Sequence, residues 1–509
     1  MDRPRRDEAA WRYHELTKHS WERIRRHPHV LDWENMPRPF KRYVGLESLP
    51  LPRDLPPSKQ PALVSLREAG EPAPLELPLL AKILLFSAGV LRRKRYAGGE
   101  IAFRAAACTG ALYHVELYVV SGDLPGLPAG VYHFAPDTFS LERLRSGDFR
   151  RFVLEATADA PAVRDAPLVL ALTSTFWRNA WKYRERAYRH AFWDSGTILA
   201  NLLGVANASG VPAKLVLGFV DRELDRLIGV DGEREATLVL VALGTGAELP
   251  PSAPEVPPLS VPTLPYSEKE VDYPLIRETH RATCLESPGE VRAWRECAFA
   301  PRRSRSESPP APGVRLPRLS APPGDPIEAV VRKRGSTRVF ARVPVASEIF
   351  GEVLASCPVP IPTDLGDAGV LSDRYVLALG VDGIEPGAYA FDPDSGELRL
   401  LRPGRFRAEG RSLALGQALG GDGAFDLYWL ADLRAVLGRH GNRGYRAAQL
   451  AAAIEGGRAY LASFALGIGA TGLTFFDDDV SAFFGVPQKA VLFLTAHGHP
   501  ASRRKRAVP

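Results

Sequence analysis

An internal repeat at a spacing of 257 residues limits what this chain can fold into. The stretches LPAGVYHFAPDTFSLERLRSGDFR (127–150) and IEPGAYAFDPDSGELRLLRPGRFR (384–407) align without a gap. Positions that match at this spacing include Gly130 with Gly387, Tyr132 with Tyr389, Arg186 with Arg443, Phe219 with Phe476 and Asp221 with Asp478. Short repeats indicate solenoids, whereas one long repeat kept over roughly 95 positions predicts two copies of one domain.

Each copy has the same predicted order of helices and strands. A helix, LELPLLAKILLFSAG in the first copy, precedes a strand at 116–120 or 374–379, and a second strand follows at GVYHF or GAYAF. A further strand (166–174) leads to a long helix over about 183–209 or 443–466, and an apolar strand closes each copy. Strands rich in Val and Leu on both faces predict a sheet covered by helices, so we expect an α+β fold.

Composition excludes several classes of protein. The chain has 509 residues, of which 45% are hydrophobic and 24% charged, and its formal charge is +6. This balance is typical of a soluble globular protein, and it fits an anionic ligand better than nucleic acid. The four cysteines form no CxxC pair, so we expect a reducing cytoplasm and no metal site. The first residues do not resemble a secretory signal. No apolar run is long enough to span a membrane, so we expect no membrane partner.

Four segments follow from these patterns. Residues 1–48 are predicted to be a helical leader, and 49–248 the first domain. Residues 249–325 are rich in Pro and Arg and predict a partly extended, partly disordered linker, in which YPLIRETHRATCLE docks on the body. The second domain is predicted over 326–509.

A basic segment, VRKRGSTRVF (331–340), is found in the second copy alone. If the backbone is extended, Arg334, Ser336 and Arg338 point to one side. Guanidinium groups bind phosphate through paired, charge-assisted hydrogen bonds, so the three side chains would form an anion site. The alternative for such a run is a solvated basic turn.

A second basic run, RRKR (503–506), follows the last predicted strand. That strand would bring Arg503 and Arg504 to the sheet edge near the basic segment, although such a run by itself is typical of a solvated tail.

Small residues in the first copy form a loop before a strand, within RAAACTGALYHVELYVV (104–120). Small side chains let a flat ligand approach the backbone N–H groups, and the alternative is a plain tight loop. We call the residues concerned the small-residue loop: Ala107, Cys108, Thr109 and Gly110.

Cations recur on the long helix that we expect WKYRERAYR (181–189) to open. Lys182, Arg186 and Arg189 are spaced to share one helix face, and the second copy keeps the pattern as Arg439, Arg443 and Arg446. Retention in both copies argues against a merely solvated face.

These motifs together resemble the SagB/ThcOx-type dehydrogenases of the nitroreductase superfamily. The resemblance rests on RxxxxxGALYxxELYVV, LPAGVYHFxPD, WKYRxRAYR and the leader YHELTKHS, and RGSTRVF is similar to the phosphate-binding motif of nitroreductase domains. It covers roughly 50–248 and 326–500. It implies a fold that dimerises and binds FMN at the interface, with the phosphate held by one subunit and the ring system against the loop of the other.

The resemblance also implies that each copy has kept half of a flavin site. Aligning the first helices places VSLRE (64–68) of the first copy where the basic segment stands in the second. Conversely, Asp367 and Val370 stand where Gly110 and Tyr113 belong. We therefore expect an intramolecular pseudo-dimer of two tandem nitroreductase-like domains with one composite FMN site.

Further site residues come from the same resemblance. Lys182 and Tyr183 match the catalytic Lys-Tyr pair of the family, and one of them would accept the substrate proton. Gly472 and Leu473, in GATGLTFFDDD (469–479), would present backbone N–H groups to the flavin ring edge, unless this is a plain connection. The family loop usually reads Pro-Ser-x-Gly-Ala-Leu-Tyr-Pro, from which Cys108 departs.

Three functions are consistent with the sequence. The first is an FMN-dependent dehydrogenase that oxidises azoline rings, or a similar C–N or C–C bond, in a peptide or natural product. The second is an NAD(P)H-dependent, nitroreductase-like reductase of small electrophiles. The third is a redox-inactive scaffold that binds a peptide or a peptide-modifying enzyme complex. The expected partners are accordingly a peptide or small-molecule substrate, with no nucleic acid.

Overall fold

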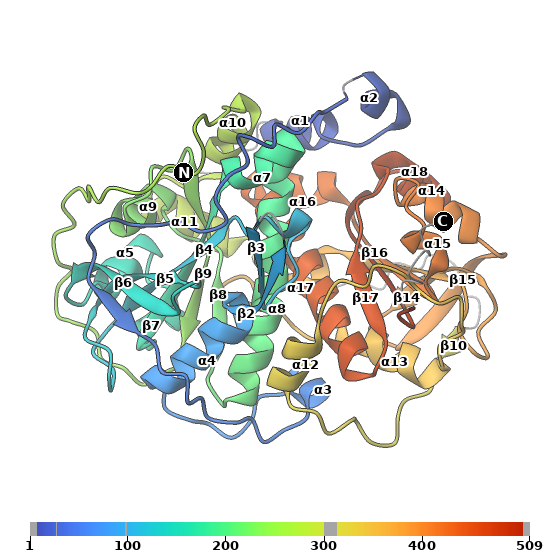
Figure 1. The fold of residues 1–509 in the computed structure, drawn as a ribbon, viewed down its shortest axis with the longest axis horizontal. Helices are drawn as coiled ribbons and strands as arrows, with labels where there is room; N and C mark the ends of the chain where they lie inside the picture. Colours follow the sequence, from blue (N-terminus) through green and yellow to red (C-terminus); the bar gives the residue numbers. More distant parts are fainter. Residues whose placement is uncertain (1–7, 27, 97–98, 300–312, 502–509) are drawn as a thin grey trace.

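The computed structural model describes residues 8–26, 28–96, 99–299 and 313–501, which form two α+β halves side by side (Figure 1). Each half has one large sheet, and two long helices lie between the sheets. Among the described residues, no helix is both long and apolar enough to cross a bilayer.

The first sheet has nine strands in the order β1-β6-β5-β4-β7-β9-β8-β11-β12. Its strands are β1 (Ser48–Pro50), β4 (Val115–Ser121), β5 (Gly130–Ala135), β6 (Ser140–Ser146), β7 (Leu168–Thr175), β8 (Ala213–Val216), β9 (Glu235–Leu243), β11 (Pro362–Thr363) and β12 (Gly366–Asp367). Strand β4 is buried along its whole length. Leu117 and Val119 face one core and Tyr118 and Val120 the other, because successive strand side chains alternate.

The second sheet repeats this arrangement with seven strands, in the order β10-β15-β14-β13-β16-β18-β17. Its strands are β10 (Val314–Arg315), β13 (Asp373–Ala378), β14 (Gly387–Asp392), β15 (Glu397–Pro403), β16 (Phe425–Ala431), β17 (Gly469–Gly472) and β18 (Ala490–Gly498). Its central run corresponds strand by strand to β6-β5-β4-β7-β9-β8, as the repeat predicts.

Helices cover both sheets. Those before the long connection are α1 (Ala9–Leu16), α2 (Trp21–Arg26), α3 (Ala62–Ser65), α4 (Leu77–Ala88), η1 (Thr109–Ala111), α5 (Arg150–Ala156), α6 (Pro161–Arg164), α7 (Phe176–Tyr183), η2 (Arg184–Arg186), α8 (Ala187–Ala208) and α9 (Asp221–Ile228). Those after it are α10 (Pro274–Thr283), α11 (Pro288–Glu296), α12 (Ile327–Lys333), α13 (Ser347–Ser356), η3 (Ala368–Leu371), α14 (Arg407–Leu413), α15 (Leu419–Asp422), α16 (Leu433–His440), α17 (Arg443–Ala465) and α18 (Asp477–Phe483).

Helices α8 and α17 join the halves. They approach closely because glycine replaces a side chain where they cross: a Cβ on Gly196 would lie 2.5 Å from Ala453 Cβ, and one on Gly457 2.5 Å from Ala200 Cβ. Trp193 Nε1 also donates across this contact to Gln449 Oε1, at 2.7 Å. The two helices therefore form the shared wall on which the site is built.

The prediction of one helix over 183–209 was wrong at its start. Helix α7 ends at Tyr183, Arg184 has a left-handed φ of 52°, and α8 begins at Ala187. Lys182 therefore does not share a helix face with Arg186 and Arg189.

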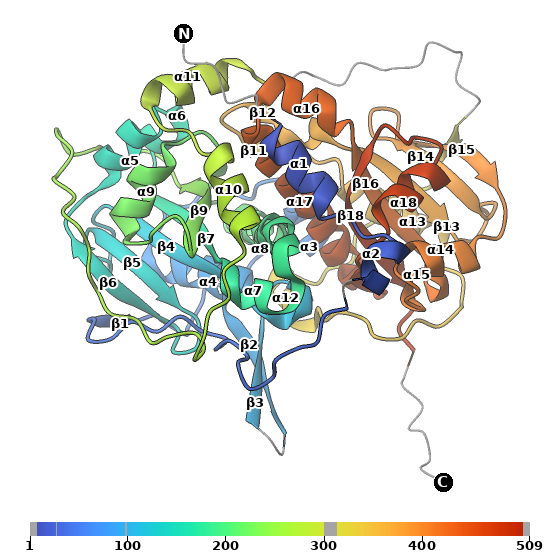
Figure 2. The same cartoon turned by 90° about the horizontal axis from the view of Figure 1, so that it is seen from above.

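A hairpin of β2 (Val90–Tyr96) and β3 (Gly99–Arg104) was not predicted. It projects from the body, as Figure 2 shows, and continues directly into the small-residue loop.

The leader and the linker are more ordered than the sequence indicated. Besides α1, α2 and β1, the leader is mostly extended chain, so the prediction of a helical leader holds only for its beginning. The linker contains α10 and α11, and its end forms β10. As expected, α10, which contains YPLIRETHRAT from Pro274 on, packs on the body, where Ile276 and Thr279 are buried.

Candidate active site

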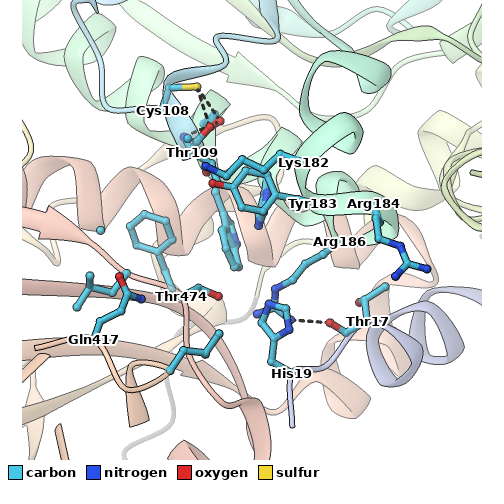
Figure 3. Close-up of a pocket in the computed structure, with 18 of the residues that line it drawn as sticks. Thr17, His19, Cys108, Thr109, Lys182, Tyr183, Arg184, Arg186, Gln417 and Thr474 are labelled. Atoms are coloured by element: carbon cyan, nitrogen blue, oxygen red, sulfur yellow. Dashed lines mark hydrogen bonds between the residues drawn. The ribbon is translucent and has the colours of Figure 1, made fainter. Parts of the chain in front are cut away.

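A cavity of about 1210 Å³ lies between the halves, and residues from four parts of the chain line it (Figure 3). The leader contributes Thr17, Lys18, His19, Arg23 and His29. The first half contributes Ala107, Cys108, Thr109, Gly110, Lys182, Tyr183 and Asp194. The second half contributes Ser336, Arg338, Tyr460, Gly472 and Leu473, and the linker Leu275. The cavity thus brings the small-residue loop and the basic segment together.

Asp194 of α8 anchors the small-residue loop. Its Oδ1 accepts from the Thr109 backbone N–H at 2.9 Å and from the Thr109 hydroxyl at 2.8 Å. Its Oδ2 accepts from the Cys108 thiol at 3.1 Å and lies 2.8 Å from His114 Nε2. One buried carboxylate therefore holds the loop in its conformation, a role that the sequence did not reveal.

Cys108, which departs from the family loop, and His114 meet at this carboxylate. His114 is fully buried, and its Nδ1 lies 2.8 Å from Ser174 Oγ. Burial, together with the charge of Asp194, raises the pKa of Cys108, so its thiol is protonated at neutral pH. Cys108, His114 and Asp194 also lie close enough for their ligand atoms to share a metal ion. Because direct hydrogen bonds already join them, we assign the cluster to loop anchoring.

Gly110 shows why this loop needs a glycine. Its φ is +65°, a left-handed value that disfavours other residues, and a Cβ there would lie 2.8 Å from the Tyr183 hydroxyl oxygen. The backbone of the loop is thus exposed toward the cavity beside Tyr183.

The basic segment reaches the same cavity from the second half. Arg334 Nε donates to the Ala105 carbonyl oxygen of the first half at 2.9 Å, while its Nη1 is buried without a hydrogen-bond partner among the described residues. Ser336 Oγ lies 3.2 Å from the Tyr460 hydroxyl, and Arg338 lines the cavity with an exposed side chain. Ser336 and Arg338 therefore line the cavity, whereas Arg334 lies at the contact with the first half.

The end of the last strand lies beside this segment. Phe340 forms a bridge with Pro500, and the Ala501 backbone N–H donates to the Val339 carbonyl oxygen at 2.9 Å. Arg503 and Arg504 themselves lie outside the described residues.

Two backbone N–H groups that were predicted to face the flavin ring edge are bonded within the protein. Gly472 N–H donates to the Tyr460 hydroxyl at 2.6 Å, and Leu473 N–H donates to the Leu494 carbonyl oxygen at 3.1 Å. Both residues line the cavity, but these donors are already bonded within the protein and do not point to a ligand.

Lys182 and Tyr183 lie at the end of α7, next to the small-residue loop. Lys182 Nζ is 5.4 Å from the centre of the Tyr183 ring, and that ring packs edge-on against His190 at 4.6 Å. Burial, with smaller contributions from Asp194 and Cys108, raises the pKa of Tyr183 well above its ordinary value. The phenol is thus protonated throughout the neutral range.

Arg186 and Arg189 tie both the leader and the second half to the site. They bond the Asp477 carboxylate at 3.1 and 2.6 Å. Arg186 also donates to the Thr17 carbonyl oxygen of the leader at 2.6 Å. Burial opposes ionisation, but the two guanidinium groups dominate and hold the pKa of Asp477 far below its ordinary value.

A second, equivalent cluster holds the other half. Arg443 and Arg446 bond Asp221 at 2.6 and 2.7 Å, and Arg446 Nε donates to Thr283 Oγ1 of α10 at 2.7 Å. The counterpart of Asp221 is therefore Asp477, the first residue of α18, and not Asp478 as the constant spacing predicted. A one-residue deletion before α18 explains the shift.

The register predicted for the missing phosphate site was also wrong. Helices α3 and α12 begin after Pro61 and Pro326, which form a bridge with each other. Counted from these prolines, the counterparts of Arg334, Ser336 and Arg338 are Ala69, Glu71 and Ala73, not Val64, Leu66 and Glu68. The first half still has no basic residue at these positions.

Charged side chains fill the loop region of the second half. Asp367 caps the Gly369 N–H at 2.8 Å, and Arg374 pairs with Glu455 of α17 in a buried contact. Arg458 donates to the carbonyl oxygens of Val359 and Pro360. These bonds occupy the space where the first half has its small-residue loop.

The leader residues at the cavity were missed, because only tertiary contacts bring them there. The His19 backbone N–H donates to Asp477 at 2.8 Å, and burial, reinforced by Arg186, lowers the pKa of its imidazole to about 3. The signal that could have pointed to the leader is the motif YHELTKHS (13–20), which contains Thr17 and His19.

Comparisons with known proteins agree with this geometry. Residues 71–245 match the model of the nitroreductase family. Over 176 residues the chain is 26% identical to the protein MJ1384 of Methanocaldococcus jannaschii, named as a nitroreductase, covering 35% of this chain and 84% of that protein. Over 140 residues it is 25% identical to the microcin B17-processing protein McbC of Escherichia coli. That match covers 26% of this chain and about half (52%) of McbC.

A solved structure matches nearly the whole chain. It is the crystal structure of an Anabaena variabilis protein also named as a nitroreductase, with a TM-score of 0.76 and 27% identity, covering 97% of this chain and 99% of that one. The predicted α+β, nitroreductase-like fold is confirmed by this similarity. Residues 71–245 therefore resemble the nitroreductase family, within a chain whose two halves share one architecture.

Proposed function

We propose that this protein is an FMN-dependent oxidoreductase with one flavin site between its halves. In this proposal the first half supplies the small-residue loop, and the second supplies Arg334, Ser336 and Arg338 for the phosphate. Its reaction is the dehydrogenation of an azoline ring, or of a similar C–N or C–C bond, in a peptide or natural product. The observation that carries the proposal is that one large cavity is lined by the small-residue loop of the first half and by Ser336 and Arg338 of the second, with Arg334 at the contact between the halves.

The residues at the cavity fit FMN. A buried Arg334 Nη1 without a partner among the described residues is expected where an anionic oxygen binds, because an unsatisfied buried donor is costly. Ser336 and Arg338 add a hydroxyl and a second guanidinium at the same end. The exposed backbone at Gly110 leaves room for a flat ring system to approach. A cavity of about 1210 Å³ is at the upper end of ordinary ligand sites, so it has room for a cofactor and a substrate.

The residues of this chain would bind, orient and move a proton. FMN, when bound, would supply the two-electron acceptor for dehydrogenation. Asp194 would hold the loop in place for the ring. Because the raised pKa of Tyr183 keeps its phenol protonated, Tyr183 would donate a hydrogen bond and not serve as base. The Lys182 nitrogen would then accept the proton that leaves the substrate.

Support for dehydrogenation comes from the SagB/ThcOx-type motifs and from the similarity to McbC, a processing protein of a peptide product. A peptide substrate, and a complex with other peptide-modifying enzymes, are part of the proposal on the same grounds. The second candidate, reduction of small electrophiles, is favoured by the nitroreductase names of MJ1384 and of the Anabaena variabilis protein.

We also propose that the chain arose by tandem duplication that included the leader. Arg186 and Arg189 hold α1 through the backbone of His14 and through Thr17. Arg446 holds α10 in the same way, through His280 and Thr283. In this proposal, α10 is the leader of the second copy, so the second domain begins before the boundary expected at 326.

The test is the visible spectrum of the purified protein, with FMN added if it is isolated colourless. Flavin absorption bands that remain after gel filtration are the expected result, and their bleaching by an azoline-containing peptide without added NAD(P)H would favour dehydrogenation. Bleaching by NAD(P)H and re-oxidation by a nitroaromatic would favour the second candidate. A protein that cannot retain FMN would contradict both enzymatic functions, and the redox-inactive scaffold would remain as the third candidate.

A further inference from the structure

Arg184, which follows α7 as the first residue of η2, has a backbone conformation that normally belongs to glycine. Its φ is 52° and its ψ is −137°. A side chain at such angles is strained, and strained residues persist where the surrounding structure imposes them, often at functional sites. The helix break that the sequence did not predict is therefore centred on an arginine in an unfavourable conformation.

The other half shows what this position requires for folding alone. The residue at the repeat spacing is Gly441, which follows α16 as Arg184 follows α7, and its φ of 62° and ψ of −166° are nearly the same. Glycine adopts this conformation without steric cost. The second half, which lacks the small-residue loop, thus has an unstrained glycine at this position. The first half, which has the loop, has a strained arginine.

The side chain of Arg184 is at the cavity and is partly open to solvent. It lines the cavity, and Figure 3 shows it on the far side of Tyr183 and Arg186 from Cys108. Its only charged partner in the described part of the chain is Glu185, at 3.8 Å, and its side chain is 39% exposed. The guanidinium is therefore held at the entrance without a hydrogen-bond partner from the described residues.

Neighbouring cations at the entrance are already engaged. Lys18 pairs with Glu15 and Asp478 at 2.7 and 2.8 Å. Arg23 donates to the Glu15 carbonyl oxygen at 2.5 Å. Arg184, by contrast, is partly exposed and is placed to receive a carboxylate from outside, which it can bind through two parallel N–H donors.

We propose that Arg184 binds a carboxylate of the substrate at the mouth of the cavity, and that the strain at this position is maintained for that role. The proposal rests on the function proposed above and narrows its substrate class to acidic peptides. The reacting group would lie at the flavin end near Tyr183, and an acidic side chain of the same molecule would lie at Arg184.

The experiment uses the full-length protein saturated with FMN and three variants of one residue. Arg184→Ala removes the guanidinium and keeps a Cβ in the strained conformation, Arg184→Gly removes both, and Arg184→Lys keeps a charge. The probe is a fluorescein-labelled tetraglutamate peptide, with a tetraglutamine peptide as the neutral control. Binding is followed by fluorescence anisotropy, and stability by thermal unfolding.

The effect on peptide binding and the effect on thermal stability should differ among the three variants. Arg184→Ala and Arg184→Gly should both weaken tetraglutamate binding about 5- to 10-fold, the effect of one partly exposed charged hydrogen bond, and Arg184→Lys should weaken it less. Only Arg184→Gly should raise the Tm, by about 2 °C, because it alone relieves the strain. The affinity for tetraglutamine should be the same for the unmodified protein and the three variants.

Two results would overturn the proposal: tetraglutamate binding by Arg184→Ala that equals that of the unmodified protein, or a Tm of Arg184→Gly no higher than that of Arg184→Ala. Flavin content, read from the same samples, separates this outcome from failure of the proposed function. If every protein retains FMN but binding is unchanged, the inference about Arg184 alone fails.

Discussion

Arg334 of the second half donates through Nε to the Ala105 carbonyl oxygen of the first half, at 2.9 Å, while its Nη1 faces no protein partner among the described residues. This bond joins the basic segment to the chain just before the small-residue loop. It places a guanidinium from one half beside the backbone that is proposed to face the flavin ring in the other. The proposed flavin site is composite because of this contact.

Loss of the Arg334 and Arg338 guanidinium groups should release the flavin. Each charged hydrogen bond to a phosphate contributes about 1.5–3 kcal/mol, so either Arg334→Ala or Arg338→Ala should weaken FMN binding by about 10- to 100-fold. Flavin fluorescence on titration measures this. The matched control is Arg67→Ala in the first half, whose guanidinium binds Glu352 and Ser356 and does not line the cavity. Equal flavin loss in the control would contradict the assignment.

The two aspartate clusters should have equal roles in folding and unequal roles at the site. Asp477→Asn and Asp221→Asn each leave buried guanidinium groups without their charge partner, which costs about 3–5 kcal/mol. We expect both to lower the free energy of unfolding in urea. Only Asp477→Asn should also weaken FMN binding, since Asp477 holds the leader and Arg186 at the cavity. Similar flavin affinities in the two variants would count against the leader as a wall of the site.

These clusters also predict loss of stability in acid. Two arginines lower the pKa of Asp221 to about 2, despite the opposing effect of burial. A carboxyl whose pKa is depressed in the folded state stabilises it above the unfolded pKa of about 4 and loses that contribution as pH falls toward 2. Unfolding in urea should therefore become markedly easier between those two values in the unmodified protein. Asp221→Asn should show a flatter profile.

Asp426 should have the opposite effect on stability. It is fully buried on β16, and burial raises its pKa well above the ordinary value. The unfolded state ionises above pH about 4 while the folded state does not, so stability falls as pH rises from there. Asp426→Asn should thus raise the free energy of unfolding at pH 7 by about 1–3 kcal/mol and change little at pH 4. Urea denaturation at the two pH values decides this, and a loss of stability at pH 7 would be inconsistent with a buried neutral carboxyl.

Tyr183 should act as a proton or hydrogen-bond donor. Tyr183→Phe is expected to keep FMN and to lower kcat about 100- to 10,000-fold, the range for one general acid or base. Because the pKa of its phenol is raised, turnover of the unmodified protein should not change near the ordinary tyrosine pKa of about 10. Steady-state rates against pH test both statements. If the variant turns over at the normal rate, the residue has no catalytic role.

Much of the fold could be predicted because the repeat and the apolar strands are local signals. Tyr132 and Tyr389 marked equivalent strands, and the buried strands at β4 and β7 were recognisable from their Val and Leu content. The break at Arg184 was not, because the run around it has helical composition and the left-handed φ arises from tertiary contacts. The projecting β2–β3 hairpin also gave no alternating apolar pattern, since most of its residues are exposed.

The site was predictable to the extent that motifs carry it. Cys108 and Arg338 line one cavity as the two-copy hypothesis requires. Asp194, which anchors the loop, and the leader residues around His19 are brought in by packing of α8 and by the Asp477 cluster. The aspartate equivalence was displaced by one residue because a constant spacing cannot follow deletions within loops.

The central claim is that one chain binds one flavin at a site made by both halves. Its most direct test is the molar ratio of FMN to protein after saturation and removal of unbound cofactor, measured from flavin absorbance and amino-acid analysis of the same sample. The account predicts a ratio of one, and a ratio near zero for the Arg334→Ala, Arg338→Ala double variant. A ratio of two, or retention of flavin by that double variant, would contradict it.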